Sequence, residues 1–294
     1  MEYELICGAL RAKAVTHGAE LVSLRDGDGV EYIWGGDPAV WPGRNPVLFP
    51  IVGGLKDGRV CFHGAAYEMN RHGFARDNEF TVETRTEDSI TLVLRDSPST
   101  RARYPFPFVL KIRHTLTPGG FTTAFTVENP GETPLPFCIG GHTAFRCPLL
   151  PGEGFEDYEL AFDRPEDTPA LLLSPKGTLL PGGEDLLRGR AVLPLDYAPF
   201  ARLDTLIFGH PRSTGVSLRH RATGKGVRLD FSGFPMVAFW TKPGAPFLCL
   251  EPWHGCAARE DEDGEFIHKP HCLVLPSGAS KTLSYSIALL PVGV

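Results

Sequence analysis

Residues 108–128 read FVLKIRHTLTPGGFTTAFTVE, and their pattern indicates the class of fold. Apolar side chains occupy every second position before Pro118-Gly119-Gly120, and a similar alternation resumes after this segment. Such alternation is typical of a strand with one buried and one solvated face, and proline followed by glycines is typical of a turn. The stretch therefore predicts an antiparallel hairpin. His114 lies on its apolar face and is expected to be a core histidine whose polar atoms find partners inside the protein.

The rest of the chain shows the same period. Further alternating segments occur at 80–84, 90–94, 216–220, 227–231 and 282–289. The first four pair as two hairpins across short turn sequences. No window of 11 residues or more has a helical period, and only 184–188 could form a helical turn. Residues 148–190 are rich in proline, glycine and acidic residues, so we expect long loops and short irregular strands there.

Glycine and proline divide the chain into many short elements, since they account for 33 and 27 of its 294 residues. No segment is poor enough in apolar residues to be a linker, and no internal repeat is evident. We therefore predict an all-β fold in which residues 1–294 form a single β-sandwich domain, larger than an immunoglobulin domain.

The composition argues against several classes of function. A net charge of −6 disfavours nucleic acids and anionic membranes as partners, because both require a basic surface. The N-terminal sequence MEYELI lacks the features of a secretory signal, and no apolar run approaches the about 18 residues of a membrane span. Seven scattered cysteines, an odd number, are typical of reduced thiols. We expect a cytoplasmic protein that is a monomer or a homodimer.

Three short segments carry groups that suit proton transfer. They read RHGFAR at 71–76, GGHTAFR at 140–146 and CLEPW at 249–253. Each places one histidine or glutamate near an aromatic residue, and the first two segments also contain glycine. Aromatic faces bind the apolar faces of a sugar ring, and titratable side chains can move protons on and off its oxygens. The three segments together indicate acid–base chemistry on a sugar.

These segments belong to a longer series that resembles the aldose 1-epimerase (galactose mutarotase-like) family, and most of all its LacX-type branch. The series also includes NPVLFPIVG at 45–53, LDTLIF at 203–208 and FWTKP at 239–243, all in the family's order. The resemblance covers essentially the whole chain. It implies a β-supersandwich with its site in a groove across one sheet. It also implies that the protein interconverts the α and β anomers of a small-molecule aldose without a cofactor.

The resemblance also implies the roles of four residues. Glu251 resembles the family's catalytic base and His142 its acid. His72 resembles the histidine beside the ring oxygen, and Asp204 resembles the aspartate that binds sugar hydroxyls. The arginines that bind sugar before the first histidine in the galactose mutarotase branch have no clear match here.

The residues themselves support two of these roles but leave alternatives open. Glu251 follows the apolar run 247–250, so burial should raise its pKa and make it a better base. The alternative is a carboxylate paired with an arginine at a strand end. His142 follows two glycines, which would let the backbone approach a ligand closely. The alternative is a core histidine in a bulge.

The other two are equally open. Cations near His72 should lower its pKa and favour a neutral imidazole that hydrogen-bonds to the sugar, although a plain turn histidine would show the same sequence. Asp204 lies in what reads as an apolar strand, where a carboxylate must be paired or used. A salt bridge to Arg202 is the structural alternative.

Weaker candidates complete the predicted site. Trp240 and Trp253 can stack on the sugar or belong to the core, and Lys242 and Arg76 are candidate polar contacts. Hexose-6-phosphate epimerases, a sister branch, share the motif HGFAR and use its arginine for the phosphate, so a phosphorylated substrate stays open. A carbohydrate-binding protein without activity is a third hypothesis.

A zinc hydrolase is the remaining alternative. It would draw on Cys249, His254, Cys256, His268, His271 and Cys272. The spacing of these residues matches no standard zinc pattern, so we predict that the protein has no metal site.

Overall fold

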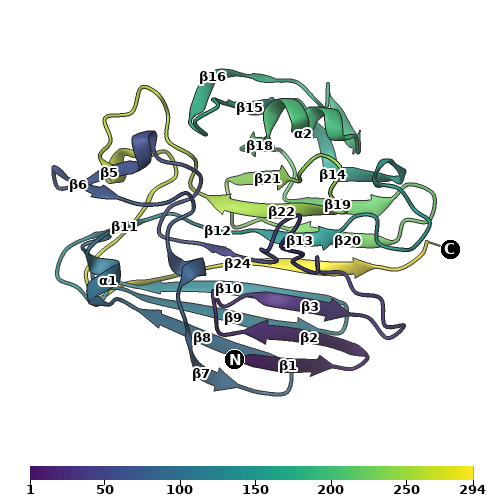
Figure 1. Cartoon of the computed structure of the whole chain (residues 1–294), viewed down its shortest axis with the longest axis horizontal. Helices are drawn as coiled ribbons and strands as arrows, with labels where there is room; N and C mark the ends of the chain where they lie inside the picture. Colours follow the sequence, from purple (N-terminus) through teal and green to yellow (C-terminus); the bar gives the residue numbers. More distant parts are fainter. Residues whose placement is uncertain (294) are drawn as a thin grey trace.

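A computed structural model describes residues 1–293, and it contains two large antiparallel sheets (Figure 1). The nine-stranded sheet has the spatial order β17 (Arg190–Pro194), β14 (Tyr158–Glu166), β19 (Gly215–His220), β20 (Gly226–Asp230), β24 (Ser280–Leu290), β10 (Gly120–Glu128), β9 (Val109–Thr117), β8 (Ser89–Arg95) and β7 (Thr81–Arg85). The eight-stranded sheet has the order β16 (Leu179–Glu184), β15 (Ala170–Leu173), β18 (Thr205–Gly209), β21 (Met236–Trp240), β22 (Phe247–His254), β12 (Ile139–Gly141) and β4 (Val47–Leu48), with β13 (Thr143–Arg146) also paired to β22.

Smaller elements surround these sheets. The N-terminal sheet consists of β1 (Glu2–Cys7), β2 (Leu10–Val15) and β3 (Leu21–Arg25), and two further pairs are β5 (Arg59–Phe62) with β6 (Ala65–Glu68) and β11 (Leu135–Phe137) with β23 (Leu273–Leu275). The helical segments are α1 (Pro98–Arg101), α2 (Tyr197–Leu203), η1 (Lys56–Gly58), η2 (Ala75–Asp77), η3 (Phe155–Asp157) and η4 (Phe266–His268). None of the helices in residues 1–293 is long and apolar enough to cross a membrane.

The predicted hairpin at 108–128 is confirmed. Strands β9 and β10 pair antiparallel with Thr117 opposite Gly120, and their residues alternate between buried and more exposed positions. His114 is buried as expected, and its ring nitrogens contact the Thr123 hydroxyl at 2.9 Å and the Ala19 carbonyl at 2.8 Å. The hairpins β7–β8 and β19–β20 and the last strand β24 are also confirmed.

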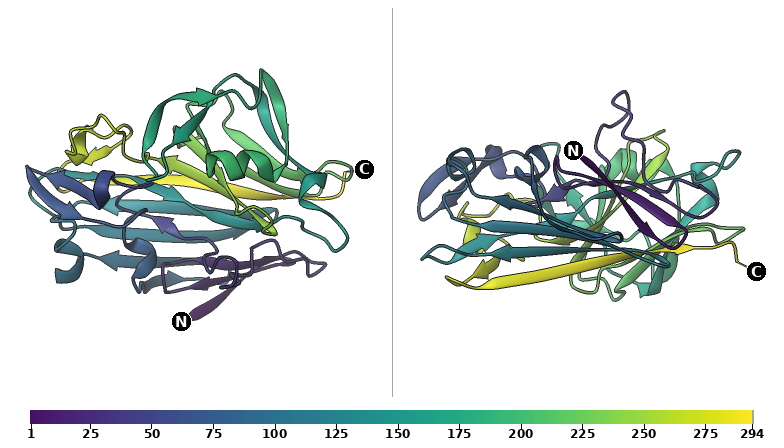
Figure 2. Two further views of the ribbon diagram at one scale, coloured as in Figure 1. Left: turned by 45° about the horizontal axis from the view of Figure 1, so that its top comes forward. Right: turned by 90° about the horizontal axis from the view of Figure 1, so that it is seen from below.

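The two large sheets pack against each other through aromatic side chains. Phe162 on β14 contacts Phe208 on β18 and Phe239 on β21, with ring centroids 5.6 and 5.9 Å apart. The turned views in Figure 2 show the strands stacked in layers. Burying both inner faces in this way gives the predicted all-β sandwich.

Residues 148–190 are more regular than predicted. The nine-residue strand β14 lies in this stretch, because Tyr158, Leu160 and Phe162 alternate along it and are buried. Residues 184–188, the one segment that could have formed a helical turn, do not form one. The short helix α2 lies further on, at Tyr197–Leu203, and the side chain of Asp196 caps it by accepting a hydrogen bond from the Ala198 amide at 2.8 Å.

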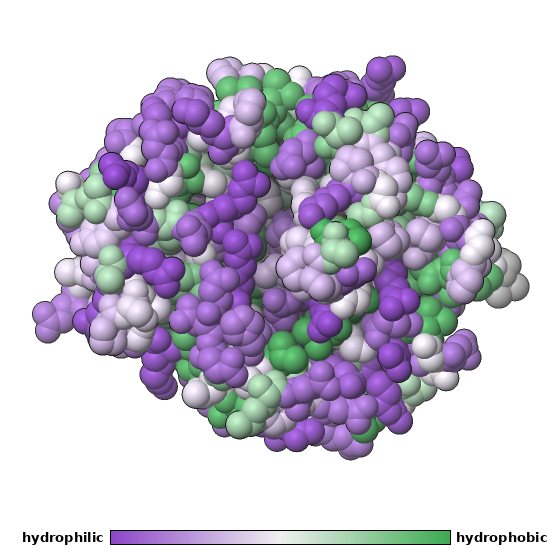
Figure 3. All heavy atoms as spheres, viewed as in Figure 1, coloured by the Kyte–Doolittle hydropathy of each residue, from purple (hydrophilic) through white to green (hydrophobic). Residues whose placement is uncertain are grey.

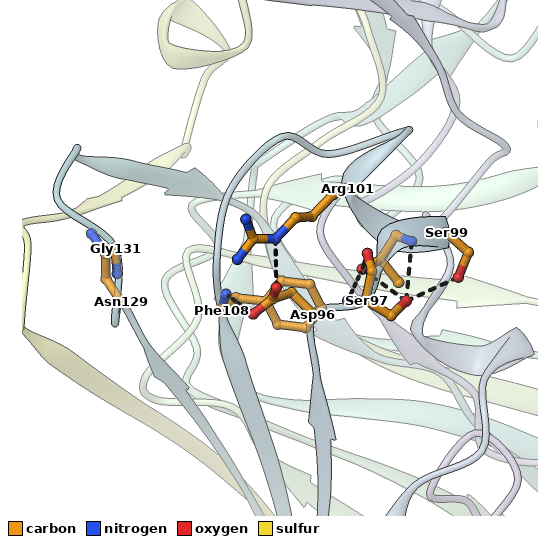
Figure 4. A network of polar contacts seen from close by, with 8 residues as sticks. Asp96, Ser97, Ser99, Arg101, Phe108, Asn129 and Gly131 are labelled. Atoms are coloured by element: carbon orange, nitrogen blue, oxygen red, sulfur yellow. Dashed lines mark hydrogen bonds and ion pairs between the residues drawn. The ribbon is translucent and has the colours of Figure 1, made fainter.

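A polar network holds the connection between β8 and β9 at α1 (Figure 4). Ser97 caps α1 by accepting a hydrogen bond from the Thr100 amide. Asp96 pairs with Arg101 at 2.6 Å and also accepts a hydrogen bond from the Phe108 amide at 3.2 Å. These contacts fix the entry of the β9–β10 hairpin into the sheet. On the face shown in Figure 3, polar residues predominate and apolar residues form only small groups.

Candidate functional site

One cavity of about 250 Å³ gathers every residue that the sequence proposed for the site. Its lining includes His72, Arg76, His142, Asp204, Trp240, Lys242, Glu251 and Trp253. The cavity lies over the eight-stranded sheet, whose strands β21, β22 and β12 run side by side near the centre of Figure 1. His72 and Trp253, which are 181 positions apart in the sequence, therefore meet at one place.

The carboxylate of Glu251 lies at the floor of this cavity. It projects from β22, where the side chains of alternate residues share one face, so that Glu251 and Trp253 point the same way. Glu251 is 1% exposed, and its Oε2 accepts a hydrogen bond from Trp253 Nε1 at 3.2 Å. Among residues 1–293, the side chain that forms an ion-pair contact with Glu251 is His142. The alternative considered from the sequence, a Glu251 carboxylate paired with an arginine, is therefore not what the structure has.

Sheet register explains why His142 faces Glu251. Strand β12 pairs Gly140 with Trp253, and β13 resumes by pairing Thr143 with Leu250. The same register runs through the interruption between the two strands, so His142 lies directly across from Glu251. Cross-strand partners project from the same face of a sheet. Their side chains accordingly meet, with His142 Nε2 3.3 Å from Glu251 Oε2.

The pair leaves two buried polar atoms without hydrogen-bond partners in the described part of the chain. They are His142 Nδ1 and Glu251 Oε1. Buried polar atoms in proteins are almost always hydrogen-bonded, and exceptions often mark a functional site. Burial raises the pKa of Glu251 well above its usual value, and the charge of Asp204 raises it further. Burial also lowers the pKa of His142 to about 3, with a smaller effect from Arg76.

These shifts determine the protonation of the pair. Burial disfavours a net charge on either member, so the state it favours is a net-neutral pair that holds one proton. The raised pKa of Glu251 and the lowered pKa of His142 favour this proton on the carboxyl, and the 3.3 Å contact between Glu251 Oε2 and His142 Nε2 lets it pass to the imidazole.

A second imidazole, that of His72, lies beside the pair, with its ring 5.7 Å from that of His142. The Gly53 amide donates a hydrogen bond to His72 Nδ1 at 3.1 Å, so the neutral ring carries its proton on Nε2. The pKa of His72 lies well below its usual value, as predicted. Burial is the larger cause, followed by His142, Arg76 and Arg71. His72 is therefore suited to donate a hydrogen bond rather than to shuttle a proton.

Asp204 lies at the rim of the cavity, and its expected setting within an apolar strand was wrong. The residue is exposed, follows the last residue of α2 with a φ of 61°, and precedes β18. The segment 201–207 that was predicted to be one strand contains the end of α2 and the beginning of β18 (Thr205–Gly209), with Asp204 between them. The suggested salt bridge to Arg202 is also wrong, because Arg202 pairs with Glu184.

Three cations line the same cavity. Arg76 donates a hydrogen bond to the Arg71 carbonyl at 2.9 Å, and the Lys242 ammonium bonds to the Val40 carbonyl. The Arg71 guanidinium lies against Gly177, where a Cβ would be 2.2 Å from its Nη2. Within residues 1–293, no carboxylate forms an ion pair with Arg71, Arg76 or Lys242, so all three charges are available to a ligand.

Trp41 is a cavity residue that the sequence did not indicate. It lies between β3 and β4, and its ring centroid is 5.2 Å from that of His142 and 5.2 Å from that of Trp240. The Trp34 indole donates a hydrogen bond to the Trp41 carbonyl at 2.9 Å. No spacing or motif marked this position, and its only signal was a tryptophan in a polar loop.

The two glycines before His142 serve a different purpose from the one expected. A Cβ at Gly140 would lie 2.9 Å from the Trp253 ring, and one at Gly141 would lie 2.9 Å from the ring of Tyr285. The expectation that they bring the backbone close to a ligand was therefore wrong. They allow β12 to pack against aromatic side chains of the protein.

The residues proposed for a zinc hydrolase do not form a metal site of their own. Of those six, Cys249 alone belongs to a group of possible ligands in the described residues, and its companions are His142 and Glu251. His254 instead contacts the His271 carbonyl at 2.9 Å, and His268 pairs with Asp263 at 2.7 Å.

Comparisons with known proteins cover the full chain. Residues 1–270 match the profile of the family described as aldose 1-epimerase. The chromosomal LacX protein of Lactococcus lactis subsp. lactis is 37% identical over 99% of this chain and 100% of that protein. The galactose mutarotase-related enzyme of Lactobacillus acidophilus is 29% identical, with a TM-score of 0.91 over 100% of both chains. A galactose mutarotase-like protein of Lactobacillus casei is 28% identical, with a TM-score of 0.86 over 98% of this chain and 100% of that one.

Proposed function

This chain belongs to the aldose 1-epimerase family, and we propose that it interconverts the α and β anomers of free hexoses by acid–base ring opening. Family membership identifies it more coarsely as a mutarotase-like sugar epimerase, an isomerase whose substrate is a small carbohydrate. The proposal adds the reaction on unphosphorylated hexoses and the residues that perform it.

One observation carries the proposal. Glu251 and His142 form a buried pair at the floor of the cavity, and each keeps a polar atom without a partner within residues 1–293. Such an arrangement costs stability unless a ligand uses it. Proton transfer from one oxygen of a substrate to another requires an acid and a base side by side, which this pair supplies.

The contact between Glu251 and His142 supports a reaction in two stages, ring opening and ring closure. Glu251 takes the proton of the C1 hydroxyl while His142 gives its proton to the ring oxygen. The C1–O5 bond then breaks, and C1 becomes an aldehyde. Rotation about C1–C2 presents the other face of the carbonyl. The ring oxygen attacks that face, His142 takes back the proton, and Glu251 returns its proton to the new hydroxyl.

The remaining residues hold the sugar. The indole faces of Trp41, Trp240 and Trp253 provide apolar surface for the ring. His72 donates a hydrogen bond from Nε2 to a sugar oxygen, and Asp204 at the rim accepts hydrogen bonds from hydroxyls. Both members of the pair are buried, and a buried setting strengthens electrostatic effects on the transition state.

Polarimetry of fresh α-glucose and α-galactose tests this proposal. Glu251→Gln keeps the shape of the side chain but removes the base, so we expect the rate to fall by about 10²–10⁴-fold. Glu68→Gln on the exposed strand β6 is the matched control and should leave the rate unchanged. A Glu251→Gln enzyme that is folded and fully active would refute the assignment. Sugar binding without any acceleration by the wild type would instead favour a carbohydrate-binding protein.

A phosphorylated hexose is a second candidate substrate, favoured by Arg71, Arg76 and Lys242. All three line the cavity, and none forms an ion pair with a carboxylate in the described residues. Comparing kcat/KM for glucose and glucose 6-phosphate separates the two candidates. A higher kcat/KM for glucose 6-phosphate that is lost in Arg76→Gln would favour the phosphorylated substrate. Equal kcat/KM values for the two sugars would argue against it.

A further inference from the structure

The thiol of Cys249 lies beside the acid–base pair without serving the reaction. Cys249 precedes Glu251 by two residues on β22, so both side chains project from the same face of the strand. It is fully buried among Trp34, Ala144 and Phe247, and it does not line the sugar cavity. Neither proton transfer nor sugar binding requires a thiol at this position.

Cys249 nevertheless completes a group of metal-ligating atoms. Its Sγ, a ring nitrogen of His142 and a carboxylate oxygen of Glu251 all lie within 4.8 Å of one another. All three side chains are buried, and this is the one group of its kind found in residues 1–293. His142 Nδ1 and Glu251 Oε1 have no hydrogen-bond partner among these residues. The facing atoms, His142 Nε2 and Glu251 Oε2, contact each other, and Oε2 also accepts a hydrogen bond from Trp253, so a metal ion would replace their mutual contact.

We propose that His142, Cys249 and Glu251 form a binding site for a thiophilic divalent metal, with Zn²⁺ the ion that fits best, and that the bound metal inhibits the enzyme.

The distances suit tetrahedral zinc. With bonds of about 2.0 Å to nitrogen and oxygen and about 2.3 Å to sulfur, a tetrahedral zinc ion holds its ligand atoms about 3.3–3.6 Å apart. His142 Nε2 and Glu251 Oε2 are already 3.3 Å apart. The ligand atoms lie within 4.8 Å of one another, so the thiol needs to move inward by at most about 1.5 Å, which a rotation about its Cα–Cβ bond supplies. Three protein ligands leave the fourth position of a tetrahedral zinc ion for a water molecule.

The chemistry of the ligands selects the class of metal. Sulfur, nitrogen and oxygen together suit Zn²⁺ and Co²⁺, whereas Mg²⁺ and Ca²⁺ require mostly oxygen ligands. Coordination releases two protons, one from the Cys249 thiol and one from the proton shared by Glu251 and His142. The thiolate and the carboxylate then balance the two positive charges of the metal. The loaded site is neutral overall, as burial requires.

Inhibition follows from the choice of ligands and rests on the proposed function. A metal bound to both Glu251 and His142 prevents either from exchanging a proton with the sugar. It also occupies the place of the C1 hydroxyl, so metal and sugar exclude each other. We expect inhibition that raises the apparent KM and leaves kcat unchanged. At ten times the dissociation constant of zinc, the rate at low sugar concentration should fall about elevenfold.

Metal titration of the chelator-treated full-length protein tests the site without any sugar. Co²⁺ serves as the spectroscopic probe, because a thiolate ligand gives an ultraviolet charge-transfer band. Calorimetry with Zn²⁺ gives the stoichiometry, and proton release is measured in parallel. Cys249→Ala and the more conservative Cys249→Ser remove the ligand, and Cys147→Ala is the matched control, since Cys147 is also a fully buried thiol outside the cavity.

The expected result is specific to Cys249. The wild type and Cys147→Ala should bind Zn²⁺ with one equivalent more than the Cys249 variants, and they alone should show the cobalt band. The Cys249 variants should keep mutarotase activity while becoming at least about tenfold less sensitive to zinc, and Mg²⁺ should inhibit none of the proteins.

Two outcomes separate this proposal from the proposed function. A wild type that shows the cobalt band but no epimerase activity would retain the metal site and refute the function. Active, folded Cys249 variants that bind cobalt with the same band and respond to zinc like the wild type would overturn the metal site. A wild type without the band would overturn it as well, whatever its activity.

Discussion

Replacing Gly73 with alanine tests whether the turn that carries His72 depends on a close approach between two backbone segments. Gly73 has a φ of 74°, and a Cβ there would lie 2.2 Å from the Phe49 carbonyl oxygen and 2.5 Å from its carbon. Both atoms belong to the backbone, so no side-chain rotation relieves the overlap. The substitution therefore adds overpacking to the cost of a left-handed conformation.

Gly58 provides a matched control that separates the two costs. Its φ is 68°, but no atom lies within 4 Å of the position that a Cβ would take. A left-handed conformation costs an L-residue about 1–2 kcal/mol, so Gly58→Ala should lower the free energy of unfolding by that amount. Overpacking adds about 1–3 kcal/mol, so Gly73→Ala should lower it by about 2–5 kcal/mol.

Urea denaturation of the wild type and both variants measures these differences, from the shift of the midpoint at a common slope. The folded fraction of Gly73→Ala should also have reduced mutarotase activity, because moving Gly73 away from Phe49 displaces His72 from the Gly53 amide. If Gly73→Ala and Gly58→Ala lose the same free energy within about 0.5 kcal/mol, the backbone approach does not constrain this turn and the reasoning is wrong.

Three further predictions concern the cavity and its support. Trp41→Ala removes an aromatic face beside His142 and should raise KM by about tenfold, whereas Trp41→Phe should recover most of the loss; equal KM values for both would argue against stacking. Thr143→Val removes the hydroxyl that donates to Asn45 Oδ1 at 2.7 Å in the buried interior, and chemical denaturation should show a loss of about 1–3 kcal/mol. The pH profile of kcat/KM should stay level between about pH 5 and 8. Independent groups with ordinary pKa values would instead confine activity to between about pH 4.3 and 6.5. The lowered pKa of His142, about 3, delays uptake of a second proton on the acid side, and the raised pKa of Glu251 delays loss of the shared proton on the alkaline side. A tenfold fall in kcat/KM for each pH unit above about 6.5 would contradict a shared proton.

The sequence predicted the strands that have one buried and one solvated face. In β9 and β10 the side chains of alternate residues are buried, and the sequence alternates between apolar and polar residues in the same way. The hairpin and its burial pattern could therefore be predicted from the sequence. The helix α2 was missed because its seven residues are too few to establish a helical period. Because the helix is so short, its end at Leu203 could not be recognised, and Asp204 was predicted to lie in a strand.

The members of the site could be proposed from the sequence, but their geometry could not. Motifs in the family's order pointed to His72, His142 and Glu251. The pairing of His142 with Glu251 depends on the register between two strands more than 100 residues apart, which no local pattern records. Trp41 was missed for the same reason, since its contacts with His142 and Trp240 are formed only in the folded chain.

The proton-sharing pair is tested most directly by a double-mutant comparison of Glu251→Gln, His142→Gln and the combined variant. Polarimetry gives kcat/KM for each, and thermal unfolding confirms that all three are folded. If the two residues act as one unit, the kcat/KM of each single variant should fall by about 10²–10⁴-fold. The kcat/KM of the combined variant should then lie within about threefold of that of the less active single variant. Losses that multiply in the combined variant would show that Glu251 and His142 act independently and would contradict a shared proton between them.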